Sequence, residues 1–416
     1  MNAGCTLDEV LKAWAEAQPE APFLVPLDAG AQITYREAWV HAQALAAYLK
    51  ELGVDRKDRV LFATRNHWMT FPLLIACAQR RATLVPIDPD LHRNTITHIA
   101  RDAAPAVVIV EEGAKLPKLS LKRQPISTAE VLEACAGFAP VEEEAQANPE
   151  DVTLMIFTSG TSGGSKAVML TGENLLANAR ALARRYAVNP SDRFLCVLPT
   201  YHMNAMMITG LVPLAAGAST ILSGLFGFKN AKRYWERVKA HEVTVCSLVP
   251  SIMAMLLRLF PEGIEGGLPR ARFAFCGAAP LSAETWRSFE ERFGLPVYQG
   301  YGLTETTCWA VSSPPDQPRR YDTVGAPLSE VCDVIIDAGR GPRGEDVVLG
   351  DAASEDLSGV GEVLIRGSVV SPGYYKNKKL TREHTGRDGY FTTGDLGFFD
   401  DEGLLHITGR LKDIII

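Results

Sequence analysis

The chain has 416 residues, of which 47% are hydrophobic and 22% charged, a composition typical of a globular protein with two or three domains. Its formal net charge of −7 gives no general attraction to nucleic acid, so a nucleic-acid partner is not expected. The eight cysteines form no C-x-x-C pair and no cysteine–histidine spacing of a zinc site. We therefore expect buried free thiols in a reducing compartment, the cytoplasm.

The first elements in chain order predict a parallel, doubly wound sheet. Residues 7–18 and 36–52 have helical patterns, and residues 23–27 and 32–35 between them predict a hairpin. Strands and helices then alternate, with strands at 59–63, 83–87 and 106–110 and helices at 67–80 and 91–102. Alternation at this spacing is typical of parallel strands joined by helices. We assign residues 1–150 to this first subdomain, with the polar stretch 115–150 as a surface connection.

A second α/β run follows and predicts another subdomain, residues 151–330. Its expected strands are 151–157, 194–198, 219–222, 243–249, 273–276 and 297–298, and its expected helices are 171–187, 203–217, 230–240, 250–260 and 282–293. After about residue 330 the helical patterns stop, and short strands are expected at 331–336, 361–366 and 404–408. The expected fold class is therefore α/β: two doubly wound, mostly parallel sheets with flanking helices, and a smaller β-rich, barrel-like lobe over residues 331–408.

One uncharged stretch is long enough for a membrane span. Residues 194–228 contain no Lys, Arg, Asp or Glu over 35 positions. Pro199, His202, Pro213 and several glycines interrupt the stretch, which favours buried strands and a helix in a large core. We expect no membrane span.

A loop rich in hydroxyls and glycine is the strongest local motif. The strand ending at Phe157 leads into residues 158–167, TSGTSGGSKA. Glycine lets backbone N–H groups turn inward around an anion, hydroxyls add donors, and lysine adds a positive charge. The loop predicts phosphate binding by Thr158, Ser159, Gly160, Thr161, Ser162, Gly163 and Lys166. It is not the P-loop pattern, because Ser165 precedes the lysine and Ala167 follows it. A flexible Gly/Ser turn is the alternative.

Three weaker motifs follow. In residues 299–305, QGYGLTE, Tyr301 can stack on a base, while Thr304 and Glu305 can hold a phosphate oxygen and a magnesium ion. In TTGDLG, residues 392–397, Asp395 suits a ribose diol because a carboxylate accepts from both hydroxyls. In GRLKD, residues 409–413, Arg410 can fork onto phosphate or ribose. Taken singly, each of the three is equally an ordinary turn or a surface ion pair.

Together and in this order, the four motifs resemble the adenylate-forming superfamily, which includes acyl- and aryl-CoA synthetases, adenylation domains of peptide synthetases and beetle luciferases. The resemblance covers nearly the whole chain. Ser162, Ser165 and Ala167 depart from the family's usual Thr, Pro and Gly. The resemblance implies that a carboxylate attacks the α-phosphate of ATP, giving acyl-AMP and pyrophosphate, and that a thiol then displaces AMP. ATP, Mg²⁺ and CoA are the implied cofactors.

The resemblance also implies roles for single residues. Implied catalytic residues are Lys166, Thr304 and Glu305, with Glu305 as the magnesium ligand. Implied nucleotide contacts are Gly277, Ala278, Ala279, Tyr301, Gly302, Thr304, Asp395 and Arg410. Implied acyl contacts are His202, Asn204, Met207, Ser247, Gly300, Trp309 and Gly325, and Trp309 is expected to shorten the acyl pocket. No acidic residue stands where peptide-synthetase domains hold an amino group, which disfavours an α-amino acid because a buried ammonium needs a counter-charge.

Two reactions and one non-catalytic role remain open at this point. The first is an acid–thiol ligase that joins a small carboxylic acid to CoA. The second is a stand-alone adenylation enzyme that loads the thiol of a carrier protein, and the third is a ligand-binding homologue without activity. The family continues past its hinge, which Lys412 matches, into a small domain carrying the lysine used in adenylation. Because the chain ends at Ile416, we expect residues 409–416 to be the start of the hinge, the small domain to be absent through excision, and adenylation to be slow.

Overall fold

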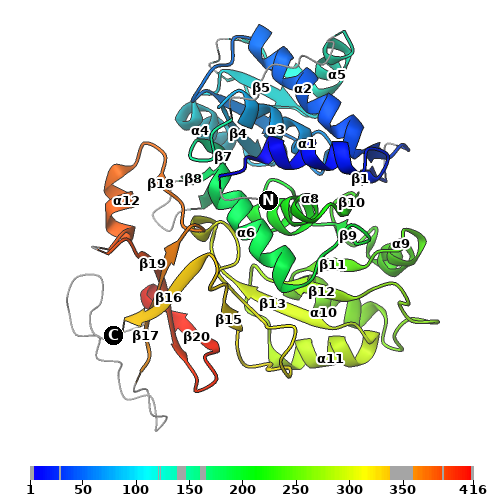
Figure 1. Cartoon of the computed structure of the whole chain (residues 1–416), viewed down its shortest axis with the longest axis vertical. Helices are drawn as coiled ribbons and strands as arrows, with labels where there is room; N and C mark the ends of the chain where they lie inside the picture. The colour runs from blue at the N-terminus through cyan, green and yellow to red at the C-terminus, as the bar shows by residue number, and fades with distance from the viewer. Residues whose placement is uncertain are drawn as a thin grey trace.

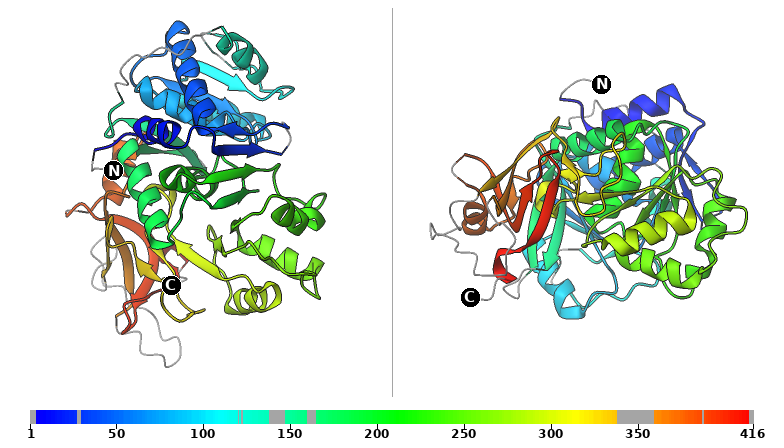
Figure 2. Two further views of the ribbon diagram at one scale, coloured as in Figure 1. Left: turned by 45° about the vertical axis from the view of Figure 1, so that its right-hand side comes forward. Right: turned by 90° about the horizontal axis from the view of Figure 1, so that it is seen from below.

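Three β-sheets organise the protein in a computed structural model that describes residues 4–27, 30–119, 121, 123–137, 147–159, 165–337, 359–386 and 388–413 (Figure 1). Two are large sheets with flanking helices, and the third is a four-stranded sheet at one side of the molecule (Figure 2). The predicted α/β class is therefore confirmed. No helix within the described ranges is both long and apolar enough to cross a membrane.

The seven-stranded sheet has the order β18-β8-β7-β4-β3-β5-β6. Its strands are β3 (Arg59–Ala63), β4 (Thr83–Ile87), β5 (Val107–Val110), β6 (Ile126–Ser127), β7 (Val152–Ser159), β8 (Ser165–Thr171) and β18 (Gly373–Tyr374). Its helices are α1 (Leu7–Ala17), α2 (Tyr35–Glu51), α3 (Thr70–Gln79), α4 (Arg93–Ala103) and α5 (Thr128–Cys135). The strands from β7 to β6 are parallel, whereas β8 and β18 are antiparallel to their neighbours.

The nine-stranded sheet has the order β15-β14-β13-β12-β11-β9-β10-β1-β2. Its strands are β1 (Pro22–Pro26), β2 (Ile33–Thr34), β9 (Arg193–Cys196), β10 (Ser219–Leu222), β11 (Val245–Leu248), β12 (Phe273–Cys276), β13 (Val297–Tyr301), β14 (Val311–Ser312) and β15 (Ala326–Pro327). The helical elements between residues 172 and 306 are α6 (Gly172–Arg185), α7 (Met203–Met206), the π-helical segment η1 (Met207–Leu211), α8 (Val212–Ala216), η2 (Ala231–Arg233), α9 (Tyr234–Ala240), α10 (Pro250–Leu259), α11 (Ala283–Phe293) and η3 (Thr304–Thr306).

The third sheet is antiparallel and open, with the order β16-β17-β19-β20, where we expected a barrel-like form. Its strands are β16 (Cys332–Asp337), β17 (Gly361–Gly367), β19 (Phe391–Phe399) and β20 (Leu405–Arg410), followed by η4 (Leu411–Asp413). The prediction that helices stop near residue 330 is wrong, because α12 (Lys378–His384) lies between β18 and β19. Residues 338–358, between β16 and β17, lie outside the described residues.

Alternating side chains of the strands fill different cores. Val60 and Phe62 of β3 face the main core, whereas Leu61 and Ala63 face the core under α4. Successive side chains of a strand point to opposite faces, so a strand covered by helices on both faces is apolar throughout. This explains why buried parallel strands such as β3 and β4 were predictable from short apolar runs.

The large sheets exchange strands along the chain. The hairpin β1–β2 belongs to the nine-stranded sheet through β10, while β7, β8 and β18 belong to the seven-stranded sheet. Because strands from different lobes share a sheet, the topology does not test the bounds predicted for the lobes. The bounds 1–150, 151–330 and 331–408 stay a prediction. The expected surface connection 115–150 contains β6 and α5, and the expected helix 203–217 is divided into α7, η1 and α8.

Candidate functional site

A cleft of about 1260 Å³ lies where the three sheets meet. The seven-stranded sheet contributes the end of β4 and the β7–β8 hairpin, and the nine-stranded sheet contributes the segments after β9 and β13. The four-stranded sheet contributes parts of β19, β20 and η4. Ends of parallel strands are where ligands bind in open α/β sheets, so this cleft is the candidate site.

Both ends of the predicted phosphate loop belong to the paired strands β7 and β8. Thr158 pairs with Lys166 and Ser159 with Ser165 across the two strands. Thr158, Ser165 and Lys166 line the cleft. The described part of the motif is thus a strand pair, which shortens the predicted ten-residue loop. Four predicted contacts lie outside the described residues: Gly160, Thr161, Ser162 and Gly163.

The second motif meets the hairpin across the cleft. Gly302, Thr304 and Glu305 line the cleft at η3. The Tyr374 hydroxyl donates to Glu305 Oε1 at 2.7 Å. Lys166 Nζ lies 5.6 Å from the centre of the same tyrosine ring. The structure therefore gathers the three predicted catalytic residues, Lys166, Thr304 and Glu305, at one cleft.

Asp395 is buried beneath the cleft wall and holds two partners. It is 3% exposed, accepts from the Tyr301 hydroxyl at 2.7 Å and pairs with Arg410 Nε at 2.6 Å. Arg410 and Lys412 line the cleft, whereas Tyr301 and Asp395 do not. A ribose bound at Asp395 would therefore have to replace Tyr301 or Arg410 as the partner of a carboxylate oxygen. The roles of Tyr301 and Asp395 stay predictions.

The segment after β12, predicted to line adenine, is only partly at the cleft. Ala278 lines the cleft and has a left-handed φ of 69°, which is uncommon for a residue with a Cβ atom. Gly277 is buried against Trp309, and the exposed Ala279 lies outside the cleft lining. Backbone strain of this kind gathers at ligand sites, which supports Ala278 among the three predicted contacts.

The predicted acyl contacts divide into two groups. His202, Asn204 and Trp309 line the cleft, together with Cys308. The others do not line the cleft: Met207, Ser247, Gly300 and Gly325. Met207 and Ser247 are buried at 0% and 1% exposure, so both belong to the interior.

Gly325 serves the backbone rather than the cleft. Its φ is +101°, and a Cβ atom there would lie 2.2 Å from the carbonyl carbon and oxygen of Ser312. It lines a separate cavity of about 10 Å³. Chain packing thus requires a glycine at this position, and no acyl contact is needed to explain it.

The buried Trp309 indole lines the cleft and packs against two glycines. It is 2% exposed, and a Cβ atom on Gly300 would lie 1.8 Å from its Cδ2. A Cβ atom on Gly277 would lie 2.8 Å from its Nε1. The Phe275 ring meets the indole edge-on at 5.2 Å, and Ser247 pairs with Phe275 on the neighbouring strand. Of these residues, only Trp309 lines the cleft.

Several cleft residues were not predicted. They are Asp88, Tyr201, Glu362, Tyr374 and His384. Asp88 directly follows β4 and accepts from the Tyr201 hydroxyl at 3.0 Å. The rule that ligands bind at the ends of parallel strands could have found Asp88. Tyr374 lies in a two-residue strand, which has no recognisable sequence pattern.

Burial sets the charge of several cleft groups. The surrounding protein lowers the pKa of His202, although Asp88 acts to raise it, so the imidazole is neutral at pH 7. Burial raises the pKa of Glu362, and the Gly394 N–H, which donates to it at 2.9 Å, opposes that shift. Burial also raises the pKa of Tyr374, with Glu305 adding to the effect, so the phenol stays a donor.

A magnesium ion fits this site only together with a phosphate ligand. Within the described ranges, no group of three or more His, Cys, Asp or Glu side chains could hold a metal ion. Mg²⁺ is commonly bound by one or two carboxylates plus substrate phosphates. Glu305, which lines the cleft beside Thr304, supplies such a carboxylate.

Comparison with known proteins agrees with this geometry. Residues 11–375 match the family described as AMP-binding enzyme. The sulfoacetate–CoA ligase of Cupriavidus necator is 30% identical over 99% of this chain and 79% of its own length. The feruloyl-CoA synthase of an Amycolatopsis species is 30% identical over 93% and 75%.

Solved structures show the same fold. ATP-bound MatB from Rhodopseudomonas palustris has a TM-score of 0.86 at 25% identity, covering 99% of this chain and 80% of that one. The inhibitor-bound N-terminal domain of FACL13 from Mycobacterium tuberculosis has a TM-score of 0.85 at 26% identity, covering 97% and 99%. The chain belongs to the AMP-binding enzyme family and is an AMP-forming acid–thiol ligase of the acyl-CoA synthetase type.

Proposed function

We propose that the cleft binds ATP between the β7–β8 hairpin and η3, and that it activates a small carboxylic acid there as an acyl-adenylate. The observation that carries this proposal is the convergence of Lys166, Glu305 and Arg410, from three separate stretches of chain, on one cleft of about 1260 Å³. That volume accommodates a nucleotide together with a small acid.

The chemistry proposed for these residues is charge cancellation. Lys166 and the Thr158 and Thr304 hydroxyls face the phosphates and offset the negative charge that builds as the acid attacks the α-phosphate. A magnesium ion held by Glu305 would supply Lewis-acid stabilisation of the phosphate oxygens. The acid carboxylate is itself the nucleophile, so no protein nucleophile is required.

The acid is proposed to lie between His202 and Trp309. Trp309 lines the cleft, and we propose that its indole limits the length of the acid, so that a short acid fits whereas an aryl or long alkyl chain would overlap it. The relatives named above include a sulfoacetate ligase and a feruloyl-CoA synthase, so their names do not select one size. The position of the indole favours the small acid.

CoA is the proposed thiol, because the curated relatives are CoA ligases. A carrier-protein thiol is the second candidate, since the adenylation step is the same for both acceptors. We propose a cytoplasmic location from the cysteines, all eight of which are free thiols and seven of which are buried.

The test is product identification. The protein is incubated with ATP, Mg²⁺ and a panel of acids from acetate to ferulate, with either CoA or a phosphopantetheine-bearing carrier protein, and the products are read by mass spectrometry. Acyl-CoA and AMP from a short acid are expected. Acylated carrier protein without acyl-CoA would select the second acceptor, and ADP in place of AMP would contradict the proposed chemistry.

A further inference from the structure

A segment of the chain crosses from the four-stranded sheet to the seven-stranded sheet beside the cleft. This crossing segment, residues 368–375, leaves β17 and ends where β18 pairs with β8. The Asn174 side-chain amide donates to the carbonyls of Ser368 and Val370 at 2.7 and 3.0 Å. The Tyr375 N–H donates to the Ala167 carbonyl at 2.8 Å. Both ends of the segment are therefore anchored to neighbouring elements.

The crossing segment holds Glu305 by its backbone and by its side chain. The Ser371 N–H donates to the Glu305 carbonyl at 2.8 Å. The Tyr374 hydroxyl donates to Glu305 Oε1 at 2.7 Å. With its backbone and one carboxylate oxygen fixed, Glu305 has little freedom to turn, and Oε2 remains for another ligand.

The Tyr374 side chain is itself fixed. It is 4% exposed, and its N–H donates to the Thr381 hydroxyl of α12 at 3.0 Å. Gly373 before it has a φ of +117°, and a Cβ atom there would lie 2.3 Å from Thr381 Cγ2. The glycine allows α12 to close on β18, so the phenol reaches Glu305 from a rigid support.

We propose that Tyr374 is a positioning residue that orients the Glu305 carboxylate towards the metal of bound MgATP. This inference rests on the proposed nucleotide site. A carboxylate that ligates a metal is usually oriented by a hydrogen bond from a neighbouring group, whose loss lowers metal affinity about 10–100-fold. Tyr374 meets this description, and its ring also contacts Lys166, the other charged group proposed to face the phosphates.

Tyr374→Phe tests the proposal because it removes only the hydroxyl. The probe is Mn²⁺ binding to the protein in the presence of ATP, followed by electron paramagnetic resonance, beside metal-free AMP binding by calorimetry. We expect Mn²⁺ affinity to fall about tenfold or more while AMP affinity and thermal midpoint stay near wild type. Tyr375→Phe is the matched control, because this adjacent tyrosine packs by Arg59 and Lys376 and does not line the cleft.

A double-mutant cycle separates positioning from a general structural effect. In a Glu305→Gln background, Tyr374→Phe should cause no further loss of Mn²⁺ affinity, because the oriented carboxylate is already absent. Additive losses, an equal fall in AMP affinity, or unchanged Mn²⁺ affinity in Tyr374→Phe would each overturn the role of Tyr374. A wild type that binds neither AMP nor ATP would overturn the proposed nucleotide site itself, and with it this role.

Discussion

At the residue scale, the buried Asp395 carboxylate joins two elements beside the cleft. Its two partners come from different elements, Tyr301 from β13 and Arg410 from β20. Tyr301 contacts Oδ2 and Arg410 contacts Oδ1 of this buried side chain. The pair therefore fixes the position of Arg410 at the cleft before any ligand binds.

Asp395→Asn is predicted to weaken AMP binding roughly 10- to 100-fold, because hydrogen bonds to a charged group contribute about 1.5–3 kcal/mol. Calorimetry with AMP measures the effect. Asp333→Asn is the matched control, since Asp333 also has a tyrosine and an arginine partner, Tyr390 and Arg366, but does not line the cleft. If both variants lose AMP affinity equally, the ribose assignment of Asp395 is wrong.

Trp309→Leu is predicted to let the cleft accept longer acids, since a smaller side chain leaves room between Gly277 and Gly300. Binding of propionyl and hexanoyl adenylate analogues is the measurement, and the hexanoyl analogue should gain most. The substitution should also lower the free energy of unfolding by about 2–4 kcal/mol, as large-to-small core changes do. Trp286→Leu, a fully buried tryptophan on α11, controls for that loss. No gain for the hexanoyl analogue would refute the indole as the limit of the cleft.

The residues of the site that were predictable are those in recognisable motifs. Lys166, Thr304 and Glu305 stand next to glycines and hydroxyls in short patterns, and all three line the cleft. The contacts that orient them are long-range: Tyr374 and Glu305 are 69 positions apart, and Tyr301 and Asp395 are 94 apart. Such pairs follow from tertiary structure, so a single sequence gives no local signal for them.

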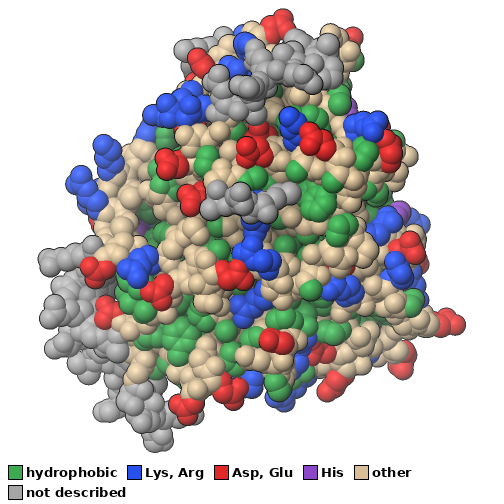
Figure 3. Space-filling view, in the orientation of Figure 1, with side chains coloured by type: hydrophobic (Ala, Val, Ile, Leu, Met, Phe, Trp, Pro, Cys, Tyr) green, Lys and Arg blue, Asp and Glu red, His purple; other side chains and the backbone are tan. Residues whose placement is uncertain are grey.

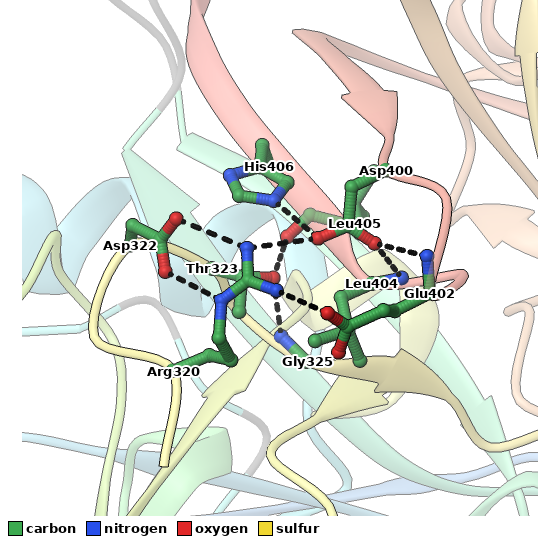
Figure 4. A network of polar contacts seen from close by, with 9 residues as sticks. All are labelled: Arg320, Asp322, Thr323, Gly325, Asp400, Glu402, Leu404, Leu405 and His406. Atoms are coloured by element: carbon green, nitrogen blue, oxygen red, sulfur yellow. Dashed lines mark hydrogen bonds and ion pairs between the residues drawn. The ribbon is translucent and has the colours of Figure 1, made fainter. Parts of the chain in front are cut away.

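At the scale of elements, one arginine joins two sheets. Arg320 precedes β15 and contacts Asp322 at 3.2 Å and both Asp400 and Glu402 at 3.1 Å (Figure 4). His406 Nε2 lies 3.0 Å from the same Asp400 carboxylate. Gly325 forms a backbone bridge with Leu405, and the Thr323 hydroxyl, which donates to the Leu405 carbonyl and accepts from the Gly325 N–H, continues the junction (Figure 4). The network fixes the β19–β20 turn against the nine-stranded sheet.

Arg320→Leu is predicted to lower the free energy of unfolding by more than the loss of a single surface pair does, because several charged partners lose their counter-charge together. Hydrogen exchange should show faster exchange at Leu404 and Leu405. Arg101→Leu, whose exposed pair with Asp102 is isolated, should have a much smaller effect. Unchanged exchange over residues 400–406 in Arg320→Leu would argue against this junction.

The elements missed from sequence have physical reasons. Helix α12 has no buried residue, so it has no apolar periodicity to recognise. Strand β8 begins directly after a Gly/Ser stretch that is typical of a loop. The expected helix 203–217 is divided into α7, η1 and α8 by a π-helical segment at Met207–Leu211. The apolar pattern of the sequence does not change there, so it gives no sign of the division.

At the scale of the whole molecule, the surface carries charges of both signs, whereas buried histidines inside it are held neutral. Figure 3 shows basic and acidic side chains interspersed over the face drawn, in keeping with the modest net charge. Burial lowers the pKa of His67 from 6.5 to about 4, and its Nδ1 accepts from the Met69 N–H at 3.1 Å. Burial likewise lowers the pKa of His41 and of His202. These imidazoles therefore resist protonation while the protein is folded.

The low pKa of these histidines predicts that the folded protein loses stability in mild acid. Above pH 6.5, His67 is neutral in both states, but below it the unfolded chain takes up the proton first, down to about pH 4. The free energy of unfolding should fall by at most about 3 kcal/mol across that window from this group. In His67→Asn, which keeps an acceptor for Met69, denaturant titrations at pH 7 and 4.5 should show a smaller fall than in wild type. A wild-type-to-variant difference independent of pH would contradict this.

The order of motifs along the chain predicted the family, but the way in which the sheets exchange strands was not predictable. The hairpin β1–β2 pairs with β10, nearly two hundred positions away in the chain, and β18 pairs with β8. Loop-closing pairings of this range depend on the packing of whole layers. The three sheets nevertheless bring the four sequence motifs to one cleft.

Binding of an acyl-adenylate analogue tests that central claim most directly. The analogue is propionyl sulfamoyl-adenosine, in which a sulfamate replaces the phosphate, and calorimetry is performed with and without ATP. We predict binding at one site per chain, tighter than that of AMP or propionate alone, and competition by ATP. No binding, or binding that ATP does not displace, would contradict the assignment of the nucleotide and the acid to this one cleft.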